Sequence, residues 1–363
     1  MMRHDTIAAV ATAPGRGGIG VVRVSGHDLR QFTETLAGRA IAPRCAVLTA
    51  YRDATGAAID EGIALYFQAP RSYTGEDVLE IQAHGGPMVL RLLLQRCLEL
   101  GARVAEPGEF TRRAFLNGKL DLAQAESVAD LIDAATAEAA RCAVRSLQGE
   151  FSRRIQGVSA SLIELRALIE ATLDFPDEDV DTVEHEAVSP KVQELRAAVQ
   201  TLLEGGKQGS LLRDGIYVAL AGQPNVGKSS LLNQLAGEEI AIVTEIPGTT
   251  RDLVRQVVDV QGIPTHIIDT AGLREARDPV ERIGVARAWQ AIAEADAVVV
   301  VVDASGMCPA DGAILDRVPA RIPRVRVMNK IDLVGRAASV EVQGAESVVW
   351  LSAKTGEGIS LLR

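Results

Sequence analysis

The sequence predicts a multidomain chain that combines an α+β domain, an α-helical domain and an α/β domain. Three observations support this fold class. The length of 363 residues exceeds the usual size of a single core. The composition turns rich in Ala, Leu, Glu and Gln near Leu120, and long apolar strands begin near Ile216. We therefore expect domains at residues 1–118, 119–213 and 214–363.

The overall composition favours a soluble protein of a reducing compartment, which we interpret as the cytoplasm. The four cysteines form no CxxC pair, no secretory segment precedes Ile7, and no apolar run is long enough to span a membrane. The net charge of −10 argues against a broad nucleic-acid-binding face. The best local candidate for an RNA contact is the segment "EFTRRAFLNGK" ending at Lys119, although a solvated helix face is favoured on charge alone.

The first domain is expected to be a small α+β fold. Short β-branched runs ("IAAVATA", "GVVRVSG", "GIALYFQAP", "DVLEIQAHGG") surround one helical stretch, "PMVLRLLLQRCLELGA". The segment "GRGGIG" from Gly15 to Gly20 matches a dinucleotide-binding fingerprint, but a strand follows it where that fingerprint requires a helix. We therefore expect a glycine-rich hairpin at this position.

Helical periodicity marks the second domain. Apolar residues recur at helical spacing through "LAQAESVADLIDAATAEAARCAVRSL" and "SASLIELRALIEATLDF". The acidic stretch "DFPDEDVDTVEHE" then predicts a solvated loop; its carboxylates lack the spacing of an EF-hand. A further helix, "SPKVQELRAAVQTLLEGG", is expected to end at Gly205 and Gly206.

The third domain carries four motifs of a guanine-nucleotide site, in order. "GQPNVGKSS" follows an apolar strand and opens a helix, so its glycines let backbone N–H groups surround a phosphate while Lys228 reaches the outer phosphates. "PGTTRD" and "DTAG" follow, and then "NKID", whose Asp332 can accept from guanine N1–H and the 2-amino group. "SAK" would back the base. The motifs supply these ligands: Ser229, Thr250 and Asp269 near Mg²⁺, Gly272 for the γ-phosphate, Asn329 and Lys330 around the base, and Ser352 to Lys354 behind it.

The residue after "DTAG" is Leu273, where many GTPases have a glutamine that orients the attacking water. Asn225 and backbone carbonyls of "TEIPGTT" could hold a monovalent cation that takes over the role of an arginine finger. Glu281 could orient the water, but from the residues alone an ordinary surface carboxylate is the preferred interpretation.

Taken together, these segments are similar to the MnmE (TrmE) family of tRNA modification GTPases. The likeness extends over the chain and includes "APGRGGIGVVRVSG", "RSYTGEDVLEIQAHGG", "EPGEFTRRAFLNGKLDLAQAESVADLID" and "DTAGLREARDPVERIGVARAW". The resemblance implies an N-terminal domain that binds folate and dimerises, and a G domain inserted into a helical domain. It also implies a chain that continues into further helices and a cysteine-containing tail, so we expect this sequence to be truncated.

The resemblance also implies site residues. Glu281 becomes the catalytic carboxylate, with Arg274 as a switch residue beside it. Arg23, Glu80 and Lys119 match positions that contact 5-formyltetrahydrofolate. The implied K⁺ ligands are Asn225, Thr244, Ile246 and Thr249, and the implied Mg²⁺ ligands are Ser229 and Thr250. The implied GTP- or GDP-binding residues are Asn225, Val226, Gly227, Lys228, Ser229, Ser230, Thr244, Thr249, Thr250, Asp269, Gly272, Asn329, Lys330, Asp332, Ser352, Ala353 and Lys354.

The function implied is a potassium-activated GTPase that acts as a homodimer without membrane contact. With the FAD-containing MnmG (GidA) protein, it would add an aminomethyl or carboxymethylaminomethyl group at C5 of the tRNA wobble uridine, with reduced folate as the one-carbon source. The tRNAs used and the choice between ammonia and glycine remain open. Two alternatives are a ribosome-assembly GTPase and a GTP-switched scaffold; no KH or RRM signature supports the former.

Overall fold

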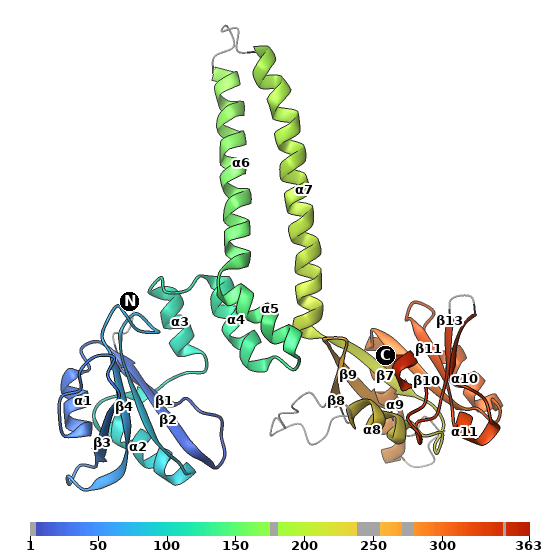
Figure 1. The fold of residues 1–363 in the computed structure, drawn as a ribbon, viewed down its shortest axis with the longest axis horizontal. Coiled ribbons are helices and arrows are strands. Elements are labelled where there is room, and N and C mark those ends of the chain that lie inside the picture. Colours follow the sequence, from blue (N-terminus) through green and yellow to red (C-terminus); the bar gives the residue numbers. More distant parts are fainter. Residues whose placement is uncertain (1–4, 175–180, 238–254, 271–278, 344–345) are drawn as a thin grey trace. The chain divides into compact units, whose positions relative to one another are not determined.

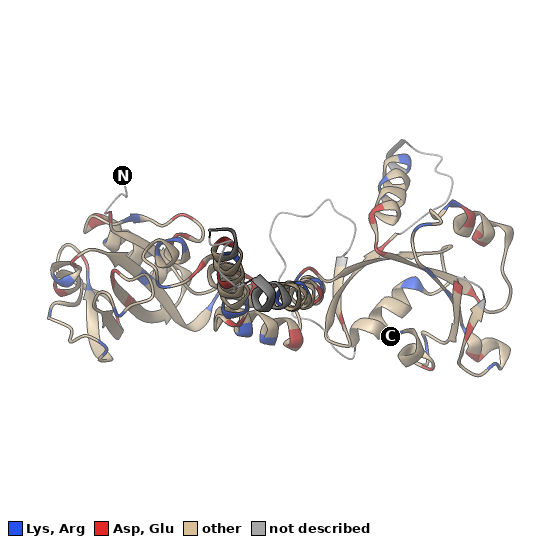
Figure 2. Ribbon diagram, turned by 90° about the horizontal axis from the view of Figure 1, so that it is seen from above, with Lys and Arg blue, Asp and Glu red and all other residues tan. Residues whose placement is uncertain are grey.

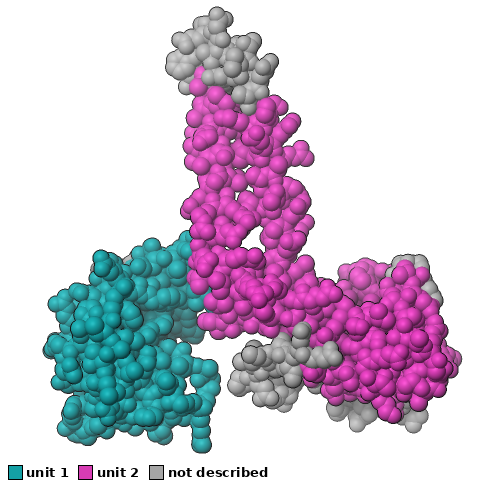
Figure 3. Space-filling view, viewed as in Figure 1, with its two compact units in different colours: residues 1–128 teal, residues 129–363 magenta. Residues whose placement is uncertain are grey.

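The computed structural model describes residues 5–174, 181–237, 255–270, 279–343 and 346–363. The chain divides into two compact units, Met1–Val128 and Ala129–Arg363, coloured separately in Figure 3. The boundary falls within helix α4 (Leu122–Asp133). The second unit contains both helical and α/β segments, so the three predicted domain ranges stay a prediction.

A six-stranded sheet forms the first unit, with strand order β3-β4-β5-β2-β1-β6. Its neighbours pair antiparallel except for β1 and β6, which pair parallel. One face of the sheet packs against helices α1 and α2 in a single core that includes Leu36, Ile81 and Leu93. The strands are β1 (Ile7–Val10), β2 (Gly17–Gly26), β3 (Val47–Arg52), β4 (Ala58–Phe67), β5 (Asp77–Gly85) and β6 (Arg103–Val104). The helices are α1 (Arg30–Ala37), α2 (Pro87–Glu99) and α3 (Glu109–Leu116).

Two features of this unit bear on the sequence expectations. Gly17 to Gly20 open strand β2, so the prediction that "GRGGIG" is not a helix-opening fingerprint is confirmed. The expectation of one helical stretch was wrong, because α1 and α3 also form. In α1 the buried Thr33, Leu36 and Ala37 recur at helical spacing over only 8 residues, too few for a clear periodic signal.

The basic segment before Lys119 forms α3, and it is not a fully solvated face. Arg113 is buried, and its guanidinium donates to Glu76 Oε2 at 3.0 Å, to Asp5 Oδ1 at 3.0 Å and to Glu109 Oε1 at 3.1 Å. Arg103 also donates to Glu109 and Asp5. These ion pairs tie α3 to the chain just before β1, so Arg113 has a structural role.

The helical part of the second unit consists of α5 (Ala137–Leu147), α6 (Glu150–Asp174) and α7 (Asp181–Asp214). In Figure 1, α6 and α7 run side by side as a long antiparallel pair. The expected end at Gly205 and Gly206 was wrong: α7 continues through both glycines and contains Pro190. Much of the acidic stretch, from Asp181 onward, is also helical rather than a loop.

The helix α5 begins at a contact with the neighbouring sheet. Thr136 caps α5: its Oγ1 accepts from Ala139 N at 3.1 Å and donates to Gly262 O at 2.8 Å. Gly262 lies in the turn that joins strand β8 (Arg255–Val260) to strand β9 (Ile263–Asp269) and has a φ of +88°. A Cβ at this glycine would lie 2.7 Å from Glu138 Cγ, so the turn approaches the helix too closely for a side chain.

A seven-stranded sheet forms the α/β part, in the order β12-β13-β11-β10-β7-β9-β8. The five central strands are parallel, and β8 and β12 pair antiparallel at the two edges. Along β10, Val300 faces one core with α9 and α10, and Val301 faces the other with α8 and α12. The predicted α/β domain is therefore confirmed, and both faces of its sheet are covered by helices. The strands are β7 (Ile216–Ala221), β8 (Arg255–Val260), β9 (Ile263–Asp269), β10 (Ala297–Asp303), β11 (Arg324–Asn329), β12 (Ser339–Gln343) and β13 (Glu346–Leu351). The helices are α8 (Lys228–Gly237), α9 (Pro279–Glu294), α10 (Pro309–Arg317), α11 (Ile331–Val334) and α12 (Ile359–Leu362).

Within the described ranges, none of the helices combines the length and the apolar character needed to cross a membrane.

Candidate functional sites

The segment "GQPNVGKSS" connects β7 to α8 as a glycine-rich loop. Gly222 has a φ of +146°, and a Cβ there would lie 2.4 Å from Val301 O. Gly227 has a φ of +97°, and a Cβ there would lie 2.3 Å from Asn329 Nδ2. Only glycine satisfies both the backbone conformation and the close approach. The loop leads directly into the N-terminus of α8, where backbone N–H groups and the helix dipole favour a phosphate.

Lys228 occupies the first position of α8 with only 8% of its surface exposed. Its Nζ donates to Gly222 O at 2.9 Å and to Gln223 O at 3.0 Å. Burial lowers the pKa of this ammonium, and the nearby Asp269 carboxylate opposes that effect. Two carbonyl groups of the loop thus bind the Lys228 ammonium in this structure. A bound phosphate would accept the same hydrogen bonds in their place. The next two residues, Ser229 and Ser230, are exposed on the first turn of α8.

Asp269 ends β9 beside the glycine-rich loop. Its Oδ1 is buried and has no hydrogen-bond partner among the residues that the structure describes. Burial raises the pKa of this carboxyl, and Lys228 acts in the opposite direction. A buried carboxylate oxygen without a partner is stabilised by a cation or by water bound to one, so this residue fits a Mg²⁺ site.

Asn329 joins the glycine-rich loop to the last motif. Its Nδ2 donates to Val226 O at 2.7 Å, and its Oδ1 accepts from Ala353 N at 2.8 Å. Ser352 Oγ donates to Asp332 Oδ1 at 2.6 Å, and Asp332 is exposed to solvent. The structure therefore brings "NVGK", "NKID" and "SAK" together at the carboxyl ends of parallel strands, where α/β sheets bind ligands.

Lys330 follows Asn329 in a left-handed conformation, with φ +70° and ψ +38°. Its Nζ lies 2.7 Å from Asp303 Oδ2 at the end of β10. Asp303 was not among the predicted site residues. The only signal in the sequence was an acidic residue that ends the apolar run "AVVVVVD".

Several predicted residues lie outside the described part of the chain. These are the two switch residues Gly272 and Arg274, the unusual Leu273, and the cation ligands Thr244, Ile246, Thr249 and Thr250. Glu281 belongs to α9 by its backbone, but its side chain is not described. Of the implied K⁺ ligands, Asn225 is described: it is exposed, with a φ of +64°.

The first unit brings two of its three predicted residues together. Arg23 and Glu80 are direct neighbours on β2 and β5, and Glu80 Oε1 accepts from Arg23 Nη2 at 2.8 Å and Nε at 3.0 Å. The Arg23 guanidinium lies 5.4 Å from the Tyr73 ring centroid and 5.7 Å from that of Phe110. These aromatic residues, which the sequence reasoning missed, contact Arg23 through cation–π interactions.

The third predicted residue, Lys119, is exposed. Its Nζ donates to Pro70 O at 3.1 Å, in the loop that also carries Tyr73. Lys119 therefore anchors to the loop beside the Arg23–Glu80 pair. No contact with the pair itself is described.

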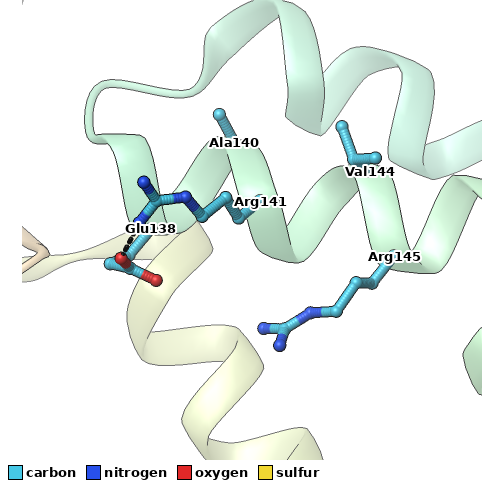
Figure 4. A pocket seen from close by; sticks show the side chains of 5 residues that line it. All are labelled: Glu138, Ala140, Arg141, Val144 and Arg145. Carbon is cyan, nitrogen blue, oxygen red and sulfur yellow. Dashed lines mark hydrogen bonds and ion pairs between the residues drawn. The ribbon is translucent and has the colours of Figure 1, made fainter.

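Charged residues of both signs occur throughout the part of the chain that the structure describes. In Figure 2 basic and acidic residues are interspersed along the helices and loops of both units. A hollow of about 440 Å³ on α5 is lined by five residues, whose side chains Figure 4 shows: Glu138, Ala140, Arg141, Val144 and Arg145. Glu138 pairs with Arg141 and neutralises it, so the hollow presents one unpaired arginine within its lining.

Comparisons with known proteins agree with this architecture. Residues 6–119 match the family model described as the GTP-binding protein TrmE N-terminus, and residues 122–363 match that of the MnmE helical domain. The chain belongs to the MnmE family of tRNA modification GTPases. Curated MnmE proteins of Nitrosomonas eutropha and Dechloromonas aromatica are each 56% identical to it, over 100% of this chain and 81% of theirs. The MnmE of Aromatoleum aromaticum is 58% identical over 99% of this chain and 80% of its own.

Family membership assigns the coarse activity. This MnmE family member is a GTP hydrolase with a role in tRNA modification, and it binds GTP and GDP. The loop around Lys228 and the base-side residues Asn329 and Asp332 form the described part of a site with matching chemistry.

Proposed function

We propose that this protein is a potassium-activated GTPase that acts with an FAD-containing MnmG partner on the wobble uridine of tRNA in the cytoplasm. In this proposal it works as a homodimer and uses a reduced folate as the one-carbon source. The observation that carries the proposal is the likeness to MnmE over the full chain, together with the junction of the phosphate and base loops through Asn329.

Nucleotide binding follows from the described contacts. A phosphate would take over the Lys228 ammonium from the carbonyls of Gly222 and Gln223. The Asp332 carboxylate would accept from the guanine N1–H and 2-amino groups while Ser352 holds its other oxygen. Mg²⁺ would be held by Ser229 and Thr250, with Asp269 nearby, and would neutralise charge on the phosphates.

Potassium activation is proposed from the absence of a glutamine at Leu273. The Asn225 side chain has no hydrogen bond within the described residues, so its amide oxygen fits a cation ligand. Thr244, Ile246 and Thr249 would complete the cage. The cation supplies positive charge beside the phosphates, and Glu281, with Arg274 near it, would orient the water.

The potassium proposal is tested by GTP hydrolysis in KCl and in NaCl. We expect a steep rise in KCl only, because carbonyl and amide oxygens spaced for K⁺ hold the smaller Na⁺ too loosely. Asn225→Ala should lose the potassium response, whereas Glu281→Ala should lose hydrolysis and keep GTP affinity. Equal rates in the two salts would contradict the role of the cation.

Folate binding is proposed for the Arg23–Glu80 pair. Both Arg23 bonds go to Glu80 Oε1, which leaves Oε2 to accept from the amino and ring N–H groups of a pterin. Lys119 would attract the carboxylates of the folate's glutamate tail, since it is exposed at the neighbouring loop.

Calorimetric titration of the full chain with 5-formyltetrahydrofolate tests this site. Glu80→Gln keeps an oxygen that can accept from Arg23 but loses the carboxylate, and it should weaken binding by about tenfold or more. Glu61→Gln, an exposed glutamate on β4 of the same sheet, is the matched control. If the unaltered protein bound no reduced folate, the proposal that a reduced folate is the one-carbon source would be contradicted.

A further inference from the structure

The ion pair between Lys330 and Asp303 lies at the base side of the nucleotide site. Asp303 is the last residue of β10, and it pairs in register with Asn329, the last residue of β11. Ala304 N donates to Asn329 O at 2.7 Å, which fixes the two strand ends against each other. Asp303 is therefore a direct neighbour of the "NKID" motif in space, although it lies 26 residues before Asn329.

We propose that Asp303 is a positioning residue for guanine nucleotide binding, because its carboxylate holds the Lys330 ammonium so that the lysine stem lies along the face of the base. This inference rests on the proposed placement of Asn329, Lys330 and Asp332 around the guanine.

The geometry supports a positioning role. Lys330 has a left-handed backbone that L-residues rarely adopt, so its side chain leaves the chain in a direction that the fold imposes. A lysine stem has four rotatable bonds, and an unpaired ammonium would let it sample many rotamers. The 2.7 Å contact with Asp303 Oδ2 restricts those rotamers before any nucleotide arrives.

Asp303 is itself held in place. Its Oδ1 accepts from Ser305 N at 3.0 Å and from Ser305 Oγ at 2.7 Å, so the carboxylate can turn only by breaking both bonds. The Lys330 ammonium is the main cause that lowers the pKa of Asp303 to about 2, and the Ser305 bonds add to it. The carboxylate is thus ionised throughout the physiological range. About 30% of each side chain is exposed, which leaves the pair reachable by a ligand.

A double-mutant cycle in the full chain tests the inference, with fluorescent GDP binding as the readout. Asp303→Asn keeps an oxygen for Ser305 and removes only the charge, and Lys330→Met keeps the apolar stem without the ammonium. We expect each variant to weaken GDP binding by about tenfold, and the double variant by no more than either single one. The ratio of GDP to IDP affinity should stay unchanged in Asp303→Asn, because Asp332 rather than Lys330 recognises the 2-amino group that inosine lacks.

The outcomes distinguish a failure of the Asp303 positioning role from a failure of the proposed placement of Lys330 at the base. Asp303→Asn binding within twofold of the unaltered protein, or a double variant about 100-fold weaker, would overturn the positioning role alone. An unchanged Lys330→Met would remove Lys330 from the base site and the inference with it. The matched control is Glu346→Gln, which weakens ion pairs with Arg324 and Arg326. Glu346 and Arg324 are the first residues of β13 and β11, at the end of the sheet opposite to the nucleotide site, so GDP binding should stay unaltered. Melting temperatures of all variants would show whether a loss of folding, rather than of positioning, weakens binding.

Discussion

The buried side chain of Asn329 joins the glycine-rich loop ("GQPNVGKSS") to the "SAK" loop. Both of its polar atoms are used, one by Val226 O and the other by Ala353 N. A shift of one loop would therefore strain or break the hydrogen bond that Asn329 makes to the other loop. The same amide also stands 2.3 Å from where a Cβ at Gly227 would be, which explains why that position must be glycine.

Replacing Asn329 with alanine should leave two buried backbone groups without partners. We expect a loss of about 3 kcal/mol in the stability of the α/β part, since each such group costs about 1–3 kcal/mol. GDP affinity should fall as well. Chemical denaturation followed by the fluorescence of Trp350 and Trp289 would measure the first effect, and GDP titration the second.

The control for this prediction is Asn117→Ala, which removes one bond to Thr74 O in the first unit. GDP binding should not change in that variant. A weakening equal to that of Asn329→Ala would mean that the effect does not come from the loop junction.

Glu109 provides a prediction for the dependence of stability on pH. The hydrogen bond from Arg103 is the main cause that lowers the pKa of Glu109 to about 2. The hydrogen bond from Arg103 also lowers the pKa of Asp5. Because these folded-state pKa values lie below the ordinary ones, the carboxylates stabilise the fold above about pH 4.5, and that stability is lost as the pH falls toward 2. Hydrogen exchange of β1 and α3, corrected for intrinsic rates, should therefore accelerate over this range.

Glu109→Gln should exchange faster at neutral pH and show a smaller further change on acidification. Glu106→Gln, whose side chain is 63% exposed in its pair with Arg112, should behave as the unaltered protein does. An identical pH response in both variants would contradict the role of the buried ion pairs.

The sequence predicted which motif segments lie together, because each motif has a local geometric requirement. The glycines and Lys228 are specified by their spacing around a phosphate. Asp303, Tyr73 and Phe110 could not be found in this way. Their contacts with Lys330 and Arg23 depend on which strands and loops become neighbours, and no local pattern encodes that order.

At the scale of single elements, α7 shows how context overrides local propensity. Gly205 and Gly206 suggested an end because glycine is unfavourable within a helix by about 1 kcal/mol. Yet α7 runs from Asp181 to Asp214, and it packs along α6 and α5. Contacts with α6 and α5, together with the helix-favouring Leu, Gln, Glu and Lys residues on either side of the two glycines, outweigh the local cost. The parallel strands of the α/β sheet could be predicted because apolar runs such as "AVVVVVD" suit a strand buried on both faces, whereas the edge strands β8 and β12 carry no such run and were missed.

Alanine at Gly205 or Gly206 should stabilise the protein. No atom lies within 4 Å of a Cβ built at either position, and both residues have ordinary helical backbones. Each change should add about 0.5–1 kcal/mol to the stability of the helical part, by reducing the freedom of the unfolded chain. Far-ultraviolet circular dichroism during thermal unfolding would measure the gain.

Gly262→Ala is the appropriate comparison. There a Cβ would meet Glu138 Cγ at 2.7 Å, and the backbone has a positive φ. This variant should be destabilised. If Gly205→Ala lost stability as Gly262→Ala does, the helix at Gly205 would carry a constraint beyond its own backbone.

At the scale of the whole molecule, the described contacts of the nucleotide site lie within one unit. The phosphate loop, Asp269, Asn329 and the "SAK" segment all belong to residues 129–363. The core of the first unit, in contrast, is formed by residues between Ala8 and Ala102. In the sequence, the composition that turns rich in Ala, Leu, Glu and Gln near Leu120 indicated a change of domain. The two compact units divide within α4, and the predicted boundary at 118 stays a prediction.

A fragment of residues 120–363, which leaves α4 whole, should bind GDP within about twofold of the full chain. The described contacts to the nucleotide site are all retained in it. Calorimetric titration of the two proteins side by side is the measurement. A tenfold loss in the fragment would show that residues 1–119 contribute to nucleotide affinity.

The bond from Thr136 to Gly262 joins positions 126 residues apart, and it has a consequence for the evolution of the chain. The hydroxyl serves two partners at once, the first turn of α5 and the turn between β8 and β9. A side chain at 262 would push against Glu138, and loss of the hydroxyl at 136 would leave both partners unsatisfied. Substitutions at either position 136 or position 262 should therefore be restricted. Across homologues, a bulkier residue at 262 should occur only where the start of α5 has changed as well, so the two sites should vary together.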